Sequence, residues 1–283
     1  MNVSDAMTPR SRVVTVELPG TRDDLLEYLQ ERSFSSVPVV KRVDDVEQYR
    51  GLISREDLIE QPDEDQLAML MNDVPTTSED APIDEVAHLM VDEGARRVPV
   101  VDGEELVGII TVTDVVEAIA SGDVDGDVEV DAIARRDINT VYVETPLSVA
   151  EREIYFANVP YAVVLDREGE MAGLLTEVDI IHVARVVEGE SDTGESIANE
   201  DDDWMWEGIK AVGNRYLPTR NVEIPADPVS EFMSDDVVTV TKRRTAREVA
   251  QSMVSNDIEQ VPVLNGDRLC GIVRDIDLVK AAL

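Results

Sequence analysis

The chain repeats one short pattern four times, and this repetition limits the possible folds more than any other feature. Each copy has a Val-Pro pair, then a glycine, then an aspartate six residues after that glycine. The pairs are Val37-Pro38, Val98-Pro99, Val159-Pro160 and Val261-Pro262, the glycines are Gly51, Gly108, Gly173 and Gly271, and the aspartates are Asp57, Asp114, Asp179 and Asp277. A unit this small cannot bury both faces of its own sheet, so we expect adjacent copies to pack sheet to sheet and form clefts between the paired copies.

Within each copy the residue pattern predicts a strand, a helix, two strands joined by a hairpin, and a second helix. Apolar residues at helical spacing place Ile83, Val86, Ala87 and Met90 on one helix face. The proline and glycine are 13 residues apart in the first and third copies and 9 apart in the others. This predicts long hairpin loops in odd copies, short ones in even copies, and an ancestral pair that was duplicated. The third copy is predicted to have a helix about one turn shorter, between Pro146 and Pro160.

The predicted repeats occupy 1–60, 68–121, 130–187 and 230–283, with an insertion at 188–229. The insertion begins with an acidic stretch, 188–203, which lacks the apolar residues needed to fold and is expected to be a disordered linker. Trp204 and Trp206 follow in a predicted short amphipathic helix that reaches Val212. This segment either packs back on the repeats or recruits a protein partner, because tryptophan is favoured at interface hot spots.

The net charge of −36 is unusually large, with 61 acidic residues against 25 basic ones. Self-repulsion of this size is relieved at high ionic strength, which favours a halophilic protein, as in many archaea. The same charge argues against nucleic-acid binding, which requires a basic face. The chain has one cysteine and two histidines, so a zinc site is not expected, and it has neither a signal peptide nor a long apolar run. We therefore expect a cytoplasmic protein that does not bind membranes.

The second copy has the residues of a ligand site where its apolar strand runs into its last helix. Thr111 or Thr113 can cap that helix, whose free N–H groups favour an anion. Asp114, in the first turn, is suited to accept two hydrogen bonds from a ribose diol, although aspartate is also a common first-turn residue for structural reasons. Arg96 and Arg97 precede Val98-Pro99, and an arginine fork suits phosphate, although both could serve solubility alone.

These segments resemble CBS domains (the cystathionine β-synthase module) paired into two Bateman modules. The resemblance rests on the apolar-Pro-Val strand and on the Gly-x-x-Thr/Ser-x-x-Asp ending. The four-copy layout is similar to stand-alone archaeal CBS proteins and to the γ subunit of AMP-activated protein kinase. It implies an α+β fold of four β-α-β-β-α repeats in a flat disc. It also implies clefts that bind AMP, ADP, ATP or relatives of S-adenosylmethionine.

The resemblance also implies roles for individual residues. The expected ribose ligands are Asp114, Asp57, Asp277 and Asp179, and the expected phosphate ligands are Arg96, Arg97, Thr111, Thr113, Ser54, Arg274 and Thr176. Only the second copy has the full set. The first has Ser35 and Ser36 at the arginine positions, the fourth has Glu259 and Gln260, and the third has the bulky Tyr161. We therefore expect two occupied sites and not four.

No nucleophile–histidine pair, phosphate-binding loop or metal cluster accompanies these residues, so the sequence predicts a regulator and not an enzyme. The leading interpretation is a sensor of adenine nucleotides that acts on an unidentified protein partner, either as a monomeric disc or as a homodimer. Two alternatives stay open. One is a sensor of S-adenosylmethionine or methylthioadenosine, and the other is a ligand-free scaffold that recruits its partner through 204–212.

Overall fold

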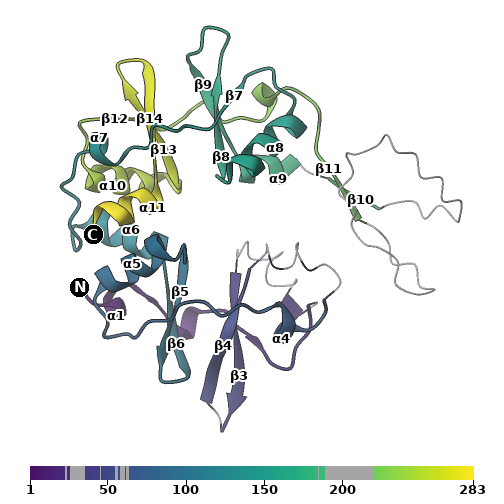
Figure 1. Cartoon of the computed structure of the whole chain (residues 1–283), viewed down its shortest axis with the longest axis vertical. Coiled ribbons are helices and arrows are strands. Elements are labelled where there is room, and N and C mark those ends of the chain that lie inside the picture. The colour runs from purple at the N-terminus through teal and green to yellow at the C-terminus, as the bar shows by residue number, and fades with distance from the viewer. Residues whose placement is uncertain are drawn as a thin grey trace, which may run out of the picture. The chain divides into compact units, whose positions relative to one another are not determined.

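The computed structural model describes residues 1–22, 24–25, 36–44, 46–54, 57, 61, 64–183, 185–188 and 220–283. These fall into two compact units. Unit 1 contains 1–135, 239–264 and 272–283, and unit 2 contains 136–238 and 265–271. The mixed α+β fold predicted from the repeats is confirmed (Figure 1). Both tryptophans, and almost all of the stretch expected to be a disordered linker, lie outside the described residues.

One mixed sheet joins the first and second repeats in unit 1. Its strands are β1 (Thr8–Pro9), β2 (Val16–Glu17), β3 (Ser36–Val43), β4 (Val46–Ser54), β5 (Arg97–Asp102) and β6 (Glu105–Thr111). The order is β1-β6-β4-β3-β2, and β5 pairs with β6. The two repeats meet where Gln48 of β4 pairs with Glu105 of β6. These adjacent copies are therefore joined by strand pairing within one sheet, whereas the prediction was that they pack sheet against sheet.

The helices of the second repeat pack against those of the fourth repeat within unit 1 (Figure 1). The second repeat contributes α5 (Ile83–Asp92) and α6 (Val112–Ser121), and the fourth contributes α10 (Ala246–Asn256) and α11 (Asp275–Ala281). The predicted apolar face of α5 is confirmed, because Ile83, Val86, Ala87 and Met90 are all buried. The fourth repeat also has β12 (Val240–Thr241), β13 (Gln260–Asn265) and β14 (Arg268–Arg274), which form a three-stranded sheet.

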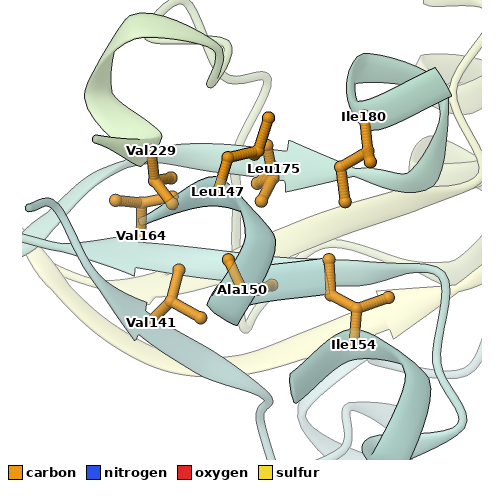
Figure 2. Close-up of a cluster of buried hydrophobic side chains, with 9 residues drawn as sticks. Val141, Leu147, Ala150, Ile154, Val164, Leu175, Ile180 and Val229 are labelled. Carbon is orange, nitrogen blue, oxygen red and sulfur yellow. The ribbon is translucent and has the colours of Figure 1, made fainter. Parts of the chain in front are cut away.

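Unit 2 contains the third repeat. Its elements are β7 (Thr140–Tyr142), α8 (Leu147–Ala157), β8 (Tyr161–Leu165), β9 (Met171–Thr176), α9 (Glu177–Val183), β10 (Arg185–Glu188) and β11 (Arg220–Glu223). Figure 2 shows its core, in which Leu147, Ala150 and Ile154 of α8 lie over the sheet residues Val141, Val164 and Leu175. Val229 joins this core from the segment that opens the fourth repeat.

The segments that open the four repeats are exchanged between neighbours, which the sequence did not predict. We call 3–9, 67–73, 130–136 and 229–235 the lead-in segments. They include the short helices α1 (Val3–Ala6), α4 (Leu67–Leu70), α7 (Val130–Ile133) and η2 (Val229–Glu231). Each lead-in pairs with the hairpin strand of the neighbouring repeat: Thr8 with Ile109, Asn72 with Leu52, Arg135 with Ile272, and Ser234 with Leu174. Each hairpin strand is therefore bordered by the lead-in of the neighbouring repeat.

This exchange gives a physical reason for three of the recurring glycines. A Cβ added at Gly108 would lie 2.8 Å from the carbonyl oxygen of Thr8. At Gly51 it would lie 2.8 Å from that of Asn72, and at Gly173 it would lie 2.7 Å from that of Ser234. Since real Cβ atoms do not approach other atoms so closely, glycine is required where the lead-in backbone crosses the strand.

Two predictions about the third repeat are wrong. Its helix α8 has 11 residues, as α10 does, so it is not a turn shorter. The connection after the helix is not shorter either, because β8 begins four positions after Ala157, just as β13 begins four positions after Asn256. The strand register also shows that Val159-Pro160 is not the counterpart of the other Val-Pro pairs. Val164 faces Gly173 as Val100 faces Gly108, so Val163 takes the position of Pro99.

The predicted division into long and short hairpin loops is wrong for the first repeat. There β3 ends at Val43 and β4 begins at Val46, so the additional residues lengthen the two strands. In the third repeat β8 ends at Leu165 and β9 begins at Met171, which is a longer loop. In the third repeat most of the apparent spacing comes from the misassigned Val159-Pro160 pair, because Gly173 lies only 10 positions after Val163. The odd–even spacing therefore no longer supports duplication of an ancestral pair.

Candidate functional site

The candidate site of the second repeat lies at the start of α6, where Thr111 is the N-cap residue. The Thr111 N–H and hydroxyl both donate to Oδ2 of Asp114, at 2.7 Å each. In return the Asp114 N–H lies 3.4 Å from the Thr111 hydroxyl oxygen. This reciprocal arrangement is a capping box, and it fixes the carboxylate at the end of the strand. Of the two threonines considered as caps, Thr111 has this role and Thr113 does not.

The recurring aspartates have the same capping role in the other repeats. Ser54 donates to Asp57 at 2.6 Å from both its N–H and its hydroxyl, and Thr176 does the same for Asp179 at 2.8 and 2.7 Å. In the fourth repeat the Arg274 N–H donates to Asp277 at 3.0 Å, and its guanidinium adds contacts of 3.2 and 3.3 Å. Arg274 is therefore paired within its own cap. The repetition of the aspartate is explained by helix capping before any ligand is considered.

The second carboxylate oxygen distinguishes these aspartates. Oδ1 of Asp57 accepts a hydrogen bond from the Asn72 side chain at 2.5 Å, and Oδ1 of Asp277 is contacted by Arg274. Among the described residues, every side-chain hydrogen bond of Asp114 ends on Oδ2. Burial raises the pKa of Asp114, while the bonds from Thr111 and the charge of Arg12 act in the opposite direction. Asp114 is thus a partly desolvated carboxylate with one oxygen available.

Arg12 is a candidate site residue that the sequence reasoning missed. It lies in η1 (Arg10–Arg12), directly after the lead-in strand that pairs with β6, and its side chain is exposed. Its neighbour Arg10 is already engaged, with bonds of 2.6 Å to Glu47 and 2.9 Å to Thr15. The available signal was the cluster Arg10-Ser11-Arg12 in a chain that is otherwise strongly acidic. Recognising it required knowing that the lead-in crosses to the second repeat.

The structure separates the two arginines predicted to bind phosphate. Arg97 opens β5 and pairs with Thr111 across the hairpin, next to the cap. The Arg96 side chain instead binds the fourth repeat, with distances of 2.6 and 3.3 Å to the carboxylate of Asp275 and 3.4 Å to Glu259. The Arg96 guanidinium is therefore neutralised by acids of another repeat.

A small pocket lies beside this ion pair, within unit 1. It has a volume of about 110 Å³ and is lined by Thr113, Glu117, Asp257, Glu259 and Asp275 together with apolar residues of α6 and α10. This is smaller than the roughly 300 Å³ at which drug-sized ligand pockets begin. Thr113 therefore faces acidic residues at the boundary with the fourth repeat, whereas Thr111 belongs to the cap.

The positions equivalent to Arg97 carry no cation in the other repeats. Ser36 pairs with Ser54 in the first repeat, and its buried hydroxyl oxygen has no hydrogen-bond partner among the described residues. Tyr161 pairs with Thr176 in the third and is only 1% exposed. Gln260 is buried in the fourth. Ser35 lies outside the described residues.

Neither metal chemistry nor membrane insertion is indicated in the part of the chain that the structure describes. No group of three or more histidine, cysteine, aspartate or glutamate side chains there could hold a metal ion. Likewise, none of the helices described is long and apolar enough to cross a membrane.

The fold and the site define a tandem-repeat protein whose neighbouring repeats exchange their lead-in segments. The chain belongs to the CBS-domain family, because the family's model matches residues 3–64, 67–121, 130–185 and 229–283. Proteins of this family are generally regulatory, and no catalytic role is indicated for this chain.

Two archaeal relatives are similar to this chain over nearly its whole length. One uncharacterised protein of Methanocaldococcus jannaschii is 27% identical over 279 residues, covering 98% of this chain but only 61% of the relative. The chain thus spans less than two thirds of that protein. A second uncharacterised protein of the same organism is 25% identical, with 95% of each chain covered.

Two solved structures cover the whole chain. An uncharacterised conserved protein from Pyrococcus horikoshii has a TM-score of 0.70 and 28% identity, with 100% of both chains covered. A Methanocaldococcus jannaschii protein described as a candidate archaeal homologue of the γ subunit of AMP-activated protein kinase has a TM-score of 0.69 and 22% identity, again with 100% of both covered. At that identity the second likeness establishes the fold alone.

Proposed function

We propose that this chain is a non-catalytic sensor that binds an adenine nucleotide between paired CBS repeats and signals its occupancy to a protein partner. The observation that supports this best is the site of the second repeat. It combines a partly desolvated carboxylate, Asp114, whose Oδ1 accepts no side-chain hydrogen bond from the described residues, with the exposed cation Arg12, which follows the lead-in of the first repeat. A carboxylate beside a cation suits a ligand that has a hydroxyl pair and a phosphate.

The proposed roles follow from this placement. Oδ1 of Asp114 accepts hydrogen bonds from the ribose hydroxyls while Oδ2 stays in the cap. The N-terminal end of α6, which has 10 residues, lies beside the phosphate with Thr111, whereas Thr113 lines the acidic pocket and is not assigned to the phosphate. Arg12 and Arg97 balance the phosphate charge, since both belong to elements that border the cap.

We propose the first repeat as the second occupied cleft. Its cap, Ser54 and Asp57, is complete, and the buried hydroxyl of Ser36 lacks a partner, which is uncommon unless a ligand or water satisfies it. Asn72 must release Asp57 for a ribose to bind there. The third and fourth repeats are weaker candidates. The third has the buried Tyr161 at the position of Arg97, and in the fourth Arg274 contacts both oxygens of Asp277.

The test is calorimetric titration of AMP, ADP, ATP and adenosine into the full chain in molar potassium chloride. We expect Asp114→Asn to weaken AMP by roughly tenfold to a hundredfold, since a hydrogen bond to a charged group contributes about 1.5–3 kcal/mol. The matched control Asp179→Asn changes the equivalent cap of the third repeat and should leave the tightest site unchanged. Unaltered AMP affinity in Asp114→Asn would exclude the assigned ribose contact.

A sensor of S-adenosylmethionine or methylthioadenosine is the second candidate, and the acidic pocket favours it. Four carboxylates line that pocket beside Thr113, and the charge of Arg96 is already balanced by Asp275. Such surroundings suit a cationic group better than a phosphate chain. Arg12→Ala separates the two ligand classes: it should weaken AMP severalfold and leave S-adenosylmethionine unaffected.

A further inference from the structure

The ion pair of Arg96 joins equivalent positions of two repeats. The carbonyl oxygen of Arg96 accepts the N–H of Val112, the first residue of α6, at 3.0 Å. In the fourth repeat the carbonyl oxygen of Glu259 accepts the N–H of Asp275, the first residue of α11, at 2.8 Å. The basic residue of one repeat therefore contacts the acidic residue that takes its place in the other. This backbone bond also holds Arg96 at the start of α6, next to the Thr111 cap.

The two partners of this ion pair differ in how firmly they are held. The Asp275 side chain is only 8% exposed, and its Oδ1 also accepts the N–H of Ile276 at 2.7 Å. The Arg96 side chain is 44% exposed. Asp275 would keep its hydrogen bond from Ile276 if the pair opened, and the Arg96 side chain already borders solvent. The arginine is therefore the side that moves.

We propose that Asp275 competes with the ligand's phosphate for Arg96. This rests on the proposed nucleotide site in the second repeat. Without ligand, Arg96 binds Asp275 and Glu259; with a phosphate bound beside the cap of α6, Arg96 turns to the phosphate. Binding thus weakens the link between the second and fourth repeats, and the link in turn weakens binding by the same factor.

The contact between these repeats does not depend on the ion pair alone. Helices α6 and α10 also pack through apolar side chains, among them Val116 and Met253, which are 3% and 2% exposed. Opening the pair should therefore loosen the contact without separating the repeats. A graded change of this kind is what a partner protein could read as ligand occupancy.

The test compares AMP affinity in wild type, Asp275→Asn and Glu259→Gln, by calorimetry on the full chain in molar salt. Removing the competing charge at Asp275 should tighten AMP binding on the order of tenfold, because the partly buried bidentate ion pair of Arg96 with Asp275 is stronger than an exposed ion pair. The control Glu259→Gln also removes one negative charge, but from a side chain 62% exposed and 3.4 Å away, and should change affinity less than twofold. Adenosine, which lacks the phosphate, should bind all three proteins equally.

A double-mutant cycle makes the result specific to Arg96. In an Arg96→Ala background, Asp275→Asn should no longer tighten AMP. Asp275→Ser replaces Asp275→Asn if thermal unfolding shows that the latter is misfolded. Equal AMP affinity in wild type and in a folded Asp275 variant overturns the competition but leaves the proposed function intact. Failure of every variant to bind AMP or adenosine overturns both.

Discussion

Replacing Gly108 by alanine tests the lead-in exchange directly. The added Cβ would lie 2.8 Å from both Met7 Sδ and the Thr8 carbonyl oxygen. The methionine side chain can turn aside, but Thr8 belongs to the strand that pairs with β6. To reach ordinary contact distance, the lead-in backbone must retreat by about half an ångström, which strains that pairing.

We expect Gly108→Ala to destabilise the protein by about 1–3 kcal/mol, the usual cost of overpacking. For a chain of this size this lowers the thermal midpoint by roughly 5 °C. Circular dichroism recorded during heating in molar salt measures this thermal midpoint. The retreat also carries Arg12 away from Asp114, so AMP affinity should fall roughly fivefold, since an exposed charge contributes about 1 kcal/mol.

Gly173→Ala is the matched control. Its Cβ would meet Ser234 and Met233 in the same way, at 2.7 and 2.6 Å, but in the third repeat. Gly173→Ala should destabilise the protein by a similar amount and leave the AMP affinity of the second repeat unchanged. If Gly108→Ala unfolds within about 1 °C of wild type, the lead-in does not cross the strand as described.

Three further predictions follow from charge and burial. Raising potassium chloride from 0.1 to 2 M should raise the thermal midpoint steadily. The net charge of −36 makes the acidic residues repel one another, and at the lower concentration the Debye length of about 10 Å leaves much of this repulsion unscreened. A flat or falling midpoint would contradict this. Asp114→Asn should gain stability relative to wild type as pH rises from 4 to 7. Burial raises the pKa of Asp114, so ionisation of this carboxyl in the folded protein costs free energy as the pH rises through the raised pKa, and the asparagine avoids that cost. Denaturant titrations at both pH values measure the difference, and a relative loss of stability would show the opposite sign. Tyr49→Phe should be neutral or stabilise by up to about 1 kcal/mol in the same assay, because the Tyr49 hydroxyl is buried without a partner in the described part of the chain; a loss larger than that would reveal a missing hydrogen bond.

The sequence was sufficient to predict the repeated unit and its caps. The helix face of α5 follows from apolar spacing, and the Thr-x-x-Asp ending forms the cap that its residue types favour. Both are local patterns within a few residues. The same reasoning failed at Val159-Pro160, where a matching dipeptide was taken as the counterpart of Val98-Pro99. Register depends on which residue faces the glycine of the next strand, and the dipeptide does not carry that information.

The lead-in exchange could not be predicted because it leaves almost no local signal. Strand β1 is two residues long, and its partner lies about a hundred positions away in β6. The pairing of Arg96 with Asp275 spans 179 positions and was equally inaccessible. Both contacts arise from packing between repeats, which the residue pattern of a single repeat cannot specify.

The exchange changes how a cleft should be evaluated. Its aspartate comes from one repeat, but the residue near this aspartate comes from the neighbour. Asn72 of the lead-in contacts Asp57, and Arg12, which directly follows the lead-in, lies near Asp114. Two caps of the same type therefore lie in different electrostatic surroundings, one beside a cation and the other closed by an amide. If the candidate sites are ranked by the motif residues of each repeat alone, the second repeat comes first because it has Arg96 and Arg97. The structure supports the same rank for a different reason, because Arg96 is paired with the fourth repeat while Arg12 arrives from the first.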